Sequence, residues 1–74
     1  MWTQGTINYN GSAYRYSVKH LEEPSEFGYS EGRASKIWIE RNGETVFNYD
    51  RGMDIKAADK ATKAVLQMLL DKFN

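Results

Sequence analysis

The chain has 74 residues, which is enough for one small domain and leaves no room for a second lobe. Ten lysines and arginines balance ten aspartates and glutamates, and this zero net charge argues against a general nucleic-acid binder, in which a basic excess is typical. The absence of cysteine excludes disulfides, thiolate metal sites and cysteine nucleophiles, and an apolar content of 41% is too high for a disordered chain.

The N-terminal part carries the pattern of a β-hairpin. Two runs rich in Thr, Ile, Tyr and Val, at about residues 2–9 and 13–21, are separated by Asn10-Gly11. This dipeptide is the strongest short-range hairpin signal, because a type I′ turn needs two residues with positive φ. A two-residue turn pairs Gly5 with Tyr16. It predicts one inward face, made of Ile7, Tyr9, Tyr14, Tyr16 and Val18, and one opposite face, with Arg15, Ser17 and Lys19.

Residues 22–34 form a long acidic segment that precedes a second hairpin. A loop of this length in a compact domain is usually functional or mobile. Its glycines and nearby serines could direct N–H and O–H donors toward an anion. A phosphate-binding loop, however, is followed by a helix, whereas this loop is followed by a strand, so an anion site is not the preferred interpretation. We expect a folded loop in which Phe27 or Tyr29 covers the edge of the core, or a loop that binds a partner.

The second hairpin is predicted around Asn42-Gly43, with strands near residues 35–41 and 45–49, and two registers are open. A two-residue type I′ turn pairs Ile39 with Val46 and puts Phe47 on the opposite face. A type I turn with a bulge at Gly43 leaves Val46 behind the sheet and gives a larger apolar face, so we prefer it. That face consists of Ile37, Ile39, Phe47 and Tyr49. In both registers Trp38 lies opposite the two isoleucines.

The C-terminal part shows the spacing of an amphipathic helix that starts at Asp54, the predicted N-cap. Its apolar stripe is Ile55, Ala58, Thr62, Val65, Leu66, Leu69, Leu70 and Phe73. The order of elements predicts a single α+β domain over residues 1–74. We expect a four-stranded antiparallel sheet, built from two hairpins, with one C-terminal helix packed on one face.

Few residues suggest catalysis or metal binding. Asp50 and Asp54 are close in sequence, but calcium loops supply more oxygen ligands than these two. His20 is the only histidine, and Ser35 cannot form a dyad with its neighbour Lys36, because adjacent strand residues point to opposite faces. We therefore expect no metal and no cofactor. A small hydrolase or ion-dependent enzyme that uses His20, Asp50 and Asp54 is the weaker alternative.

Three stretches resemble a family of small, uncharacterised bacterial and phage-associated proteins. They are Ser25-Glu26-Phe27-Gly28, Gly32-Arg33-Ala34-Ser35-Lys36-Ile37 and Asn48-Tyr49-Asp50-Arg51-Gly52-Met53-Asp54. The family's pattern is Ser-Glu-x-Gly, Gly-Arg-x-Ser-Lys-Leu/Ile and Tyr-Asp-Arg-Gly-Trp-Asp, and this chain departs from it at Met53. The family has no known function, so the resemblance implies no activity. It does imply that residues 25–36 and 48–54 form one feature.

The aromatic content gives the functional expectation. One helix covers only one face of a sheet, so some of the aromatic residues, 14% of the chain, should form a surface patch of the kind that marks interfaces. Trp38 is the main candidate, joined by Trp2 if that side chain lies behind the first strand. We expect a cytoplasmic, non-enzymatic binding or accessory protein that contacts a protein partner or a second copy of itself. Its predicted binding residues are Phe27, Tyr29, Arg33, Trp38, Tyr49, Asp50 and Arg51.

A nucleic-acid-associated role is the alternative function. It would use a basic helix face made of Arg51, Lys56, Lys60 and Lys63, whose cations could meet phosphates. A membrane role is not expected, because no stretch approaches the roughly 20 apolar residues that span a bilayer.

Overall fold

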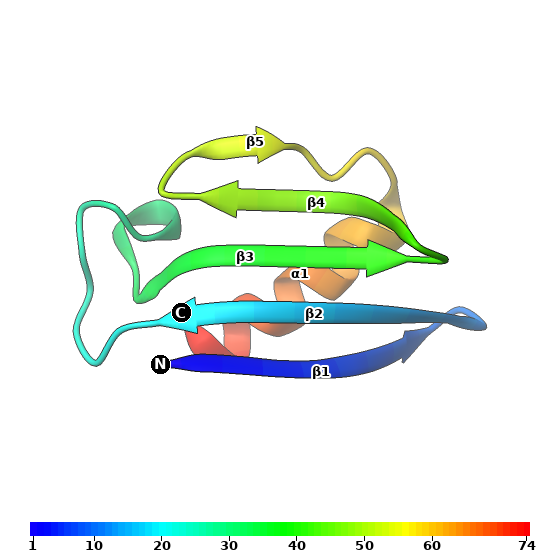
Figure 1. Cartoon of the computed structure of the whole chain (residues 1–74), viewed down its shortest axis with the longest axis horizontal. Coiled ribbons are helices and arrows are strands. Elements are labelled where there is room, and N and C mark those ends of the chain that lie inside the picture. The colour runs from blue at the N-terminus through cyan, green and yellow to red at the C-terminus, as the bar shows by residue number, and fades with distance from the viewer.

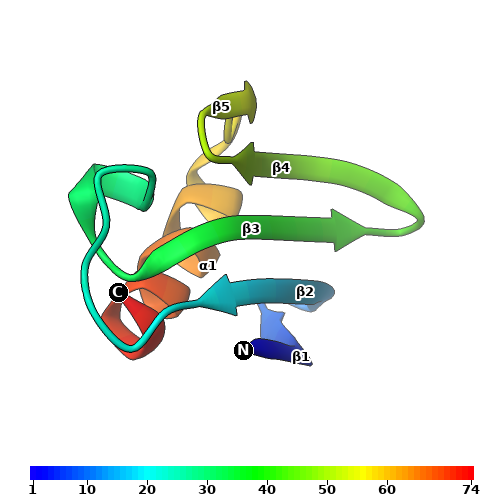
Figure 2. The same cartoon turned by 60° about the vertical axis from the view of Figure 1, so that its left-hand side comes forward.

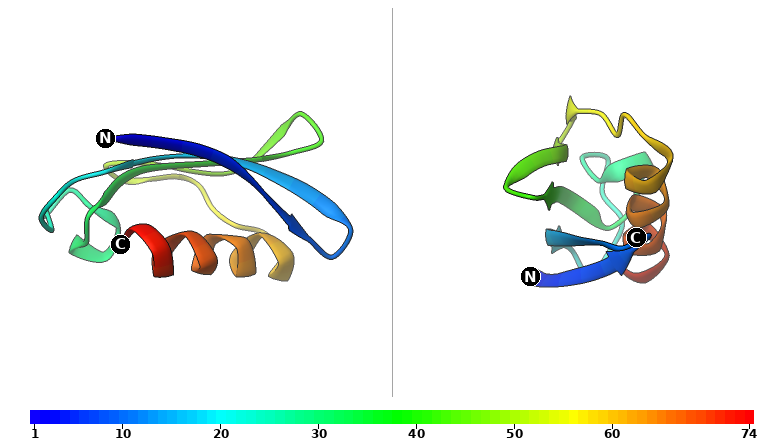
Figure 3. Two further views of the ribbon diagram at one scale, coloured as in Figure 1. Left: turned by 90° about the horizontal axis from the view of Figure 1, so that it is seen from below. Right: turned by 90° about the vertical axis from the view of Figure 1, so that its right-hand side faces the viewer.

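The computed structural model describes residues 1–74 and consists of one sheet layered on one helix (Figure 1). The five antiparallel strands follow one another in chain order: β1 (Trp2–Tyr9), β2 (Ser12–His20), β3 (Ala34–Arg41), β4 (Glu44–Asp50) and β5 (Met53–Ile55). The helix α1 (Lys60–Phe73) lies across one face, and no segment covers the other (Figure 3). The predicted arrangement of sheet and helix is confirmed, but the sheet has five strands rather than four.

The first hairpin has the predicted register. Asn10 and Gly11 have φ values of 50° and 78°, as a type I′ turn requires. Gly5 pairs with Tyr16, and the pairing runs without a bulge from Trp2 to Tyr9. As a result, alternate residues of β2 are buried on the face of the sheet that packs against α1, while Arg15 between them points to the other face.

The second hairpin combines features of both predicted registers. Asn42 and Gly43 both have positive φ, so the loop is a two-residue turn. A bulge at Val46 then shifts the alternation by one residue, and Ile39 pairs with Phe47. The larger apolar face is therefore present, but its bulge does not lie at Gly43. Val46 also packs against the core instead of lying behind the sheet.

The helix begins later than predicted. Its N-cap is Asp59, whose Oδ1 accepts a hydrogen bond from the backbone N–H of Thr62 at 2.7 Å. This hydrogen bond lowers the pKa of the Asp59 carboxyl. Asp54, the predicted cap, lies in β5, where it accepts a hydrogen bond from Asn48 at 2.9 Å. Residues 53–55 therefore satisfy their backbone groups by extending the sheet, and the prediction of helix there was wrong.

The core lies between α1 and the inner face of the sheet. The helix contributes part of the predicted stripe, Val65, Leu66, Leu69 and Phe73. The sheet contributes Tyr14, Tyr16, Val18, Ala34, Ile37, Ile39 and Phe47. No helix in the structure is long and apolar enough for a membrane crossing.

The segment between β2 and β3 is a folded loop. It contains one turn of 3-10 helix, η1 (Tyr29–Glu31), and lies beside the C-terminal end of α1 (Figure 2). The Asn74 side chain connects the two, because it accepts a hydrogen bond from the Ala34 N–H and donates one to the Tyr29 carbonyl, each at 3.1 Å. Tyr29 covers the core edge, with its ring centroid 6.3 Å from that of Phe47, whereas Phe27 is exposed. This agrees with the expected folded loop.

Candidate functional site

The face of the sheet opposite α1 is open, and we call it the outer face. The strand register arranges its side chains in three rows that run across four strands. The first row is Trp2, Lys19, Lys36 and Asp50; the second is Gln4, Ser17, Trp38 and Asn48; the third is Thr6, Arg15, Glu40 and Thr45.

Both tryptophans of the chain lie on this outer face. Trp38 is half-buried, and its indole N–H donates a hydrogen bond to Thr45 Oγ1 at 3.0 Å, which holds the ring in place. Trp2 is 53% exposed, near the start of the edge strand. The two indoles line one open, mostly apolar hollow together with Gln4 and Ser17. The face therefore presents two large rings at the point where nothing from the chain covers them.

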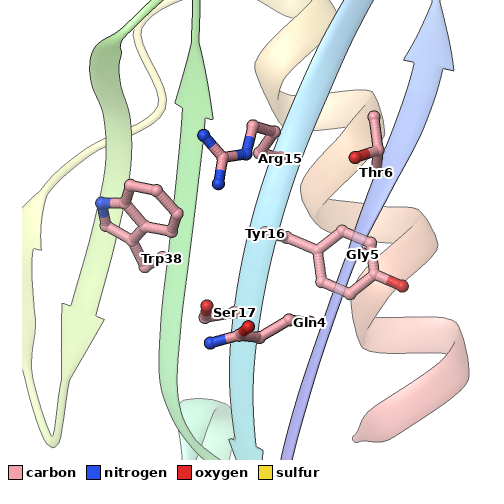
Figure 4. A pocket seen from close by; sticks show the side chains of 7 residues that line it. All are labelled: Gln4, Gly5, Thr6, Arg15, Tyr16, Ser17 and Trp38. Carbon is pink, nitrogen blue, oxygen red and sulfur yellow. The ribbon is translucent and has the colours of Figure 1, made fainter.

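A second hollow of about 320 Å³ adjoins Trp38 (Figure 4). Its walls come from β1, β2 and β3, and Figure 4 shows the Trp38 ring and the Arg15 guanidinium on one side of it. The Tyr16 ring reaches from β2 to Gly5 on β1, where an added Cβ would lie 2.6 Å from the tyrosine oxygen. Because Gly5 has no side chain, the ring can pack directly against the backbone of β1.

The charges of the outer face are mostly paired. Arg15 contacts Glu40 at 3.4 Å, and Lys36 contacts Asp50 at 3.6 Å. These ion pairs are partly exposed, so each contributes little to stability. Lys19 makes no ion pair. The outer face therefore combines two apolar rings with nearly balanced charges.

Residues 25–36 and 48–54 lie together, as the resemblance implied. The single proton of the Tyr49 hydroxyl is shared between two acceptors, the carbonyls of Gly28 at 3.2 Å and Phe27 at 3.4 Å. The rings of Tyr29 and Tyr49 meet edge to face at 5.1 Å. The backbone N–H of Arg51 also donates to the Ser35 carbonyl at 3.0 Å. These contacts connect the loop to β4 and stabilise that end of the sheet.

The structure does not bring the predicted binding residues into one site. Trp38 and Asp50 lie on the outer face, whereas Tyr29 and Tyr49 are half-buried between the loop and the sheet. Arg33 lines a separate hollow with Met1, His20, Leu21 and Glu22. The binding prediction did not include Gln4 or Arg15. The register of the first hairpin could have identified both residues. It already placed Arg15, Ser17 and Lys19 on the face opposite the core, and it pairs Gln4 with Ser17.

The turn between β4 and β5 begins beside an ion pair, because Asp50 at the end of β4 contacts Lys36 at 3.6 Å. Arg51, the next residue, adopts a positive φ of 58°.

The predicted basic helix face is not continuous. Lys60 and Lys63 are exposed on α1, but Lys56 precedes the helix and Arg51 lies in the turn between β4 and β5. The helix begins at Lys60, after its N-cap Asp59, so only two of the four cations can share a helical face. This corrects the geometry of the nucleic-acid alternative.

His20 has structural contacts. Its Nε2 lies 3.0 Å from the Thr3 hydroxyl, and its ring centroid lies 5.0 Å from that of Phe73. No three His, Asp or Glu side chains lie close enough together to hold a metal ion.

Comparison with known proteins gives a family and no activity. A family model described as a domain of unknown function, DUF7678, matches residues 1–74. No curated protein and no solved structure shows significant similarity to the chain. The match covers the whole sheet, the loop and the helix, and the chain therefore belongs to the DUF7678 family.

Proposed function

We propose that this domain is a non-enzymatic binding module that docks a partner protein on its outer face. The observation that supports this most is that Trp2 and Trp38 line one hollow on the face that α1 leaves uncovered. Tryptophan is enriched at the energetically important positions of protein interfaces, because its large ring removes much apolar area from water and its N–H can be satisfied. The Trp38 N–H is already bonded to Thr45, so a partner can cover the ring without leaving that donor unpaired.

The charges of the face limit the chemistry of the partner. Three cations, Arg15, Lys19 and Lys36, face the carboxylates of Glu40 and Asp50 and, at the β5 edge, that of Asp54, which accepts a hydrogen bond from Asn48. Lys19 is the cation that makes no ion pair, and it pairs across the strands with Trp2, beside the hollow. A matching partner carries an aliphatic or aromatic side chain for the hollow and a carboxylate near Lys19. Such a carboxylate would fix the orientation and raise the association rate more than the affinity.

The loop residues have a different role in this proposal. Tyr29 and Tyr49 support the sheet from within, so we assign the docking contacts to the two indoles. Phe27 is 55% exposed but belongs to the loop between β2 and β3 and lines neither hollow of the outer face. It therefore provides a matched control, an exposed aromatic side chain away from the proposed contact.

The experiment compares three forms of the tagged chain in capture from the native host. The wild type and Phe27→Ala should retain the same protein, and Trp2→Ala/Trp38→Ala should lose it. The purified partner should then bind the double variant at least about 30-fold more weakly, as expected when an interface anchor worth about 2 kcal/mol is removed. Equal capture by all three forms would contradict the proposal. Circular dichroism of each form confirms that the fold is retained.

The same capture experiment distinguishes the proposed protein partner from the nucleic-acid alternative. Nuclease treatment of the captured material should leave the partner bound, because the proposed contact is between proteins. A partner that is released by nuclease and by moderate salt would instead support the alternative and overturn the proposal. In that case, charge-removing substitutions at Lys60 and Lys63 would test whether the exposed cations of α1 contact phosphate.

A further inference from the structure

The edge strand β1 lacks the features that normally prevent an edge from pairing with another chain. It has eight residues, no proline, no charged side chain and no bulge, and its sequence is Trp-Thr-Gln-Gly-Thr-Ile-Asn-Tyr. Natural edge strands are usually short, charged, bulged or covered. The opposite edge follows that rule, because β5 has only three residues and carries Asp54. In Figure 1 nothing lies beyond β1 on its open side.

The backbone hydrogen bonds show which groups of β1 are unpaired. Met1 and His20 exchange both backbone hydrogen bonds, with the His20 N–H donating at 2.8 Å and the N-terminal amine donating at 3.1 Å. Bonded and non-bonded pairs alternate along an antiparallel ladder. The backbone groups that point away from β2 are therefore those of Trp2, Gln4, Thr6 and Asn8, and all four residues are exposed.

We propose that β1 pairs with β1 of a second copy of this chain, antiparallel about a twofold axis at Gly5. This register places Trp2 opposite Asn8 of the other copy and Gln4 opposite Thr6, so every outward N–H and C=O of both strands gains a partner. A shift of two residues would oppose Trp2 to Asn10, which lies in the turn, and would leave part of the edge unpaired. The preferred register therefore satisfies the largest number of backbone groups.

The side chains of β1 fit a second copy on both faces. Residues that pair across a sheet point to the same side. The exposed polar residues then meet one another on the outer side, and Thr3 meets Ile7 on the inner side, where Ile7 is half-buried. No like charges meet, because β1 has none, and two chains of zero net charge do not repel at long range. The pairing produces one continuous sheet and leaves both outer faces open, so it is independent of the proposed function.

The first test measures molar mass by light scattering during gel filtration over a range of concentrations. The wild type should reach twice the mass of one chain. Thr6→Pro removes an outward N–H without breaking a bond to β2, and proline is tolerated on an edge. It should weaken dimerisation at least about tenfold, since two symmetric hydrogen bonds are lost. The matched control Thr6→Val keeps the backbone donor and should dimerise like the wild type.

A second test remains informative if the proline variant does not fold. Because the chain has no cysteine, engineered thiols are the only ones present. Residues opposed in a bonded pair have Cα atoms about 5.5 Å apart, within the range for a disulfide. A mixture of Gln4→Cys and Thr6→Cys should therefore form the mixed disulfide in preference to either homodimer. A monomer at all concentrations, or a dimer that resists Thr6→Pro and forms no mixed disulfide, would overturn the proposal. A dimer that is lost on Trp38→Ala and kept on Thr6→Pro would also overturn it, while leaving the outer face as the contact.

Discussion

The contact between Gly5 and Tyr16 allows a quantitative test of how the first hairpin packs. An alanine Cβ at position 5 would lie 2.6 Å from the Tyr16 oxygen and 2.8 Å from its Cζ. Ordinary contact begins near 3.4 Å, so the ring has to move by about 0.8 Å. Tyr16 is only 8% exposed and its centroid lies 6.3 Å from that of Phe73, so this movement disturbs the contact between sheet and helix.

Two opposing effects determine the size of the change on Gly5→Ala. Forcing a methyl group into a packed site costs about 1–3 kcal/mol. Removing the backbone freedom of a glycine from a strand returns about 0.5–1 kcal/mol. The difference lies between about 0 and 2.5 kcal/mol, and the nearly buried Tyr16 ring favours the larger cost. We therefore expect the free energy of unfolding to fall by about 1–2 kcal/mol, and Tm by about 4–15 °C for a domain of this size.

Urea titration followed by circular dichroism measures this loss. Tyr16→Leu shortens the side chain that the new methyl group would meet, so Gly5→Ala should be less destabilising in that background. The two substitutions should show a coupling free energy of at least about 0.5 kcal/mol. Equal losses in both backgrounds, or a Gly5→Ala variant as stable as the wild type, would refute the reasoning.

Three further predictions concern the helix and the loop. The Thr62 hydroxyl is fully buried without a hydrogen-bond partner, although its proximity to Asp59 helps to lower the pKa of that carboxyl. Thr62→Val should therefore raise the free energy of unfolding, measured by urea titration, by about 1 kcal/mol. A lower free energy of unfolding in the variant would mean that the hydroxyl forms a hydrogen bond to Asp59. Asp59→Asn keeps a capping side chain but removes the charge. Because folding lowers the pKa of Asp59, its charge stabilises the fold at pH values above the ordinary pKa of 3.8, and this stabilisation is lost as the pH falls through the pKa of the folded state. The Tm of Asp59→Asn should therefore lie below that of the wild type near neutral pH, and the two values should converge in acid. A difference in Tm that does not change with pH would contradict this prediction. Tyr49→Phe removes the hydroxyl bonded to the loop carbonyls and should cost about 0.5–1.5 kcal/mol, with faster amide exchange in residues 25–33, whereas unchanged exchange would mean that other contacts hold the loop.

The local signals of the sequence were sufficient where one dipeptide determines the geometry. Asn10-Gly11 fixed a two-residue turn, and the turn fixed every pair of the first hairpin. Asn42-Gly43 gave the same turn, but the bulge at Val46 comes from the fit of β4 to the core, which turn chemistry does not specify. The helix stripe from Thr62 to Phe73 followed from its spacing. Its start did not, because Asp54 and Asp59 are both residues of a type that caps helices, and only the pairing of residues 53–55 with β4 distinguishes them.

The candidate site was predicted in part. Trp38 was placed opposite the core in either register. Trp2 was added on the condition that it lies behind the first strand, and its pairing with Lys19 meets that condition. That the two indoles share one hollow depends on the rows formed by β1, β2 and β3, and the pairing of β2 with β3 is made across the long loop, where no turn dipeptide specifies it. The loop residues Phe27 and Tyr29 looked equivalent in sequence, since both are aromatic residues beside Gly28. Contact with Phe47 and Tyr49 determines which of the two is buried.

The affinity of the purified partner for the Trp38→Ala variant, measured by titration calorimetry beside Phe27→Ala, tests the docking face most directly. We expect the Kd to rise by at least about 30-fold for Trp38→Ala and to stay within about twofold of the wild type for Phe27→Ala. Equal affinities for the two variants would show that the Trp38 indole does not hold the partner.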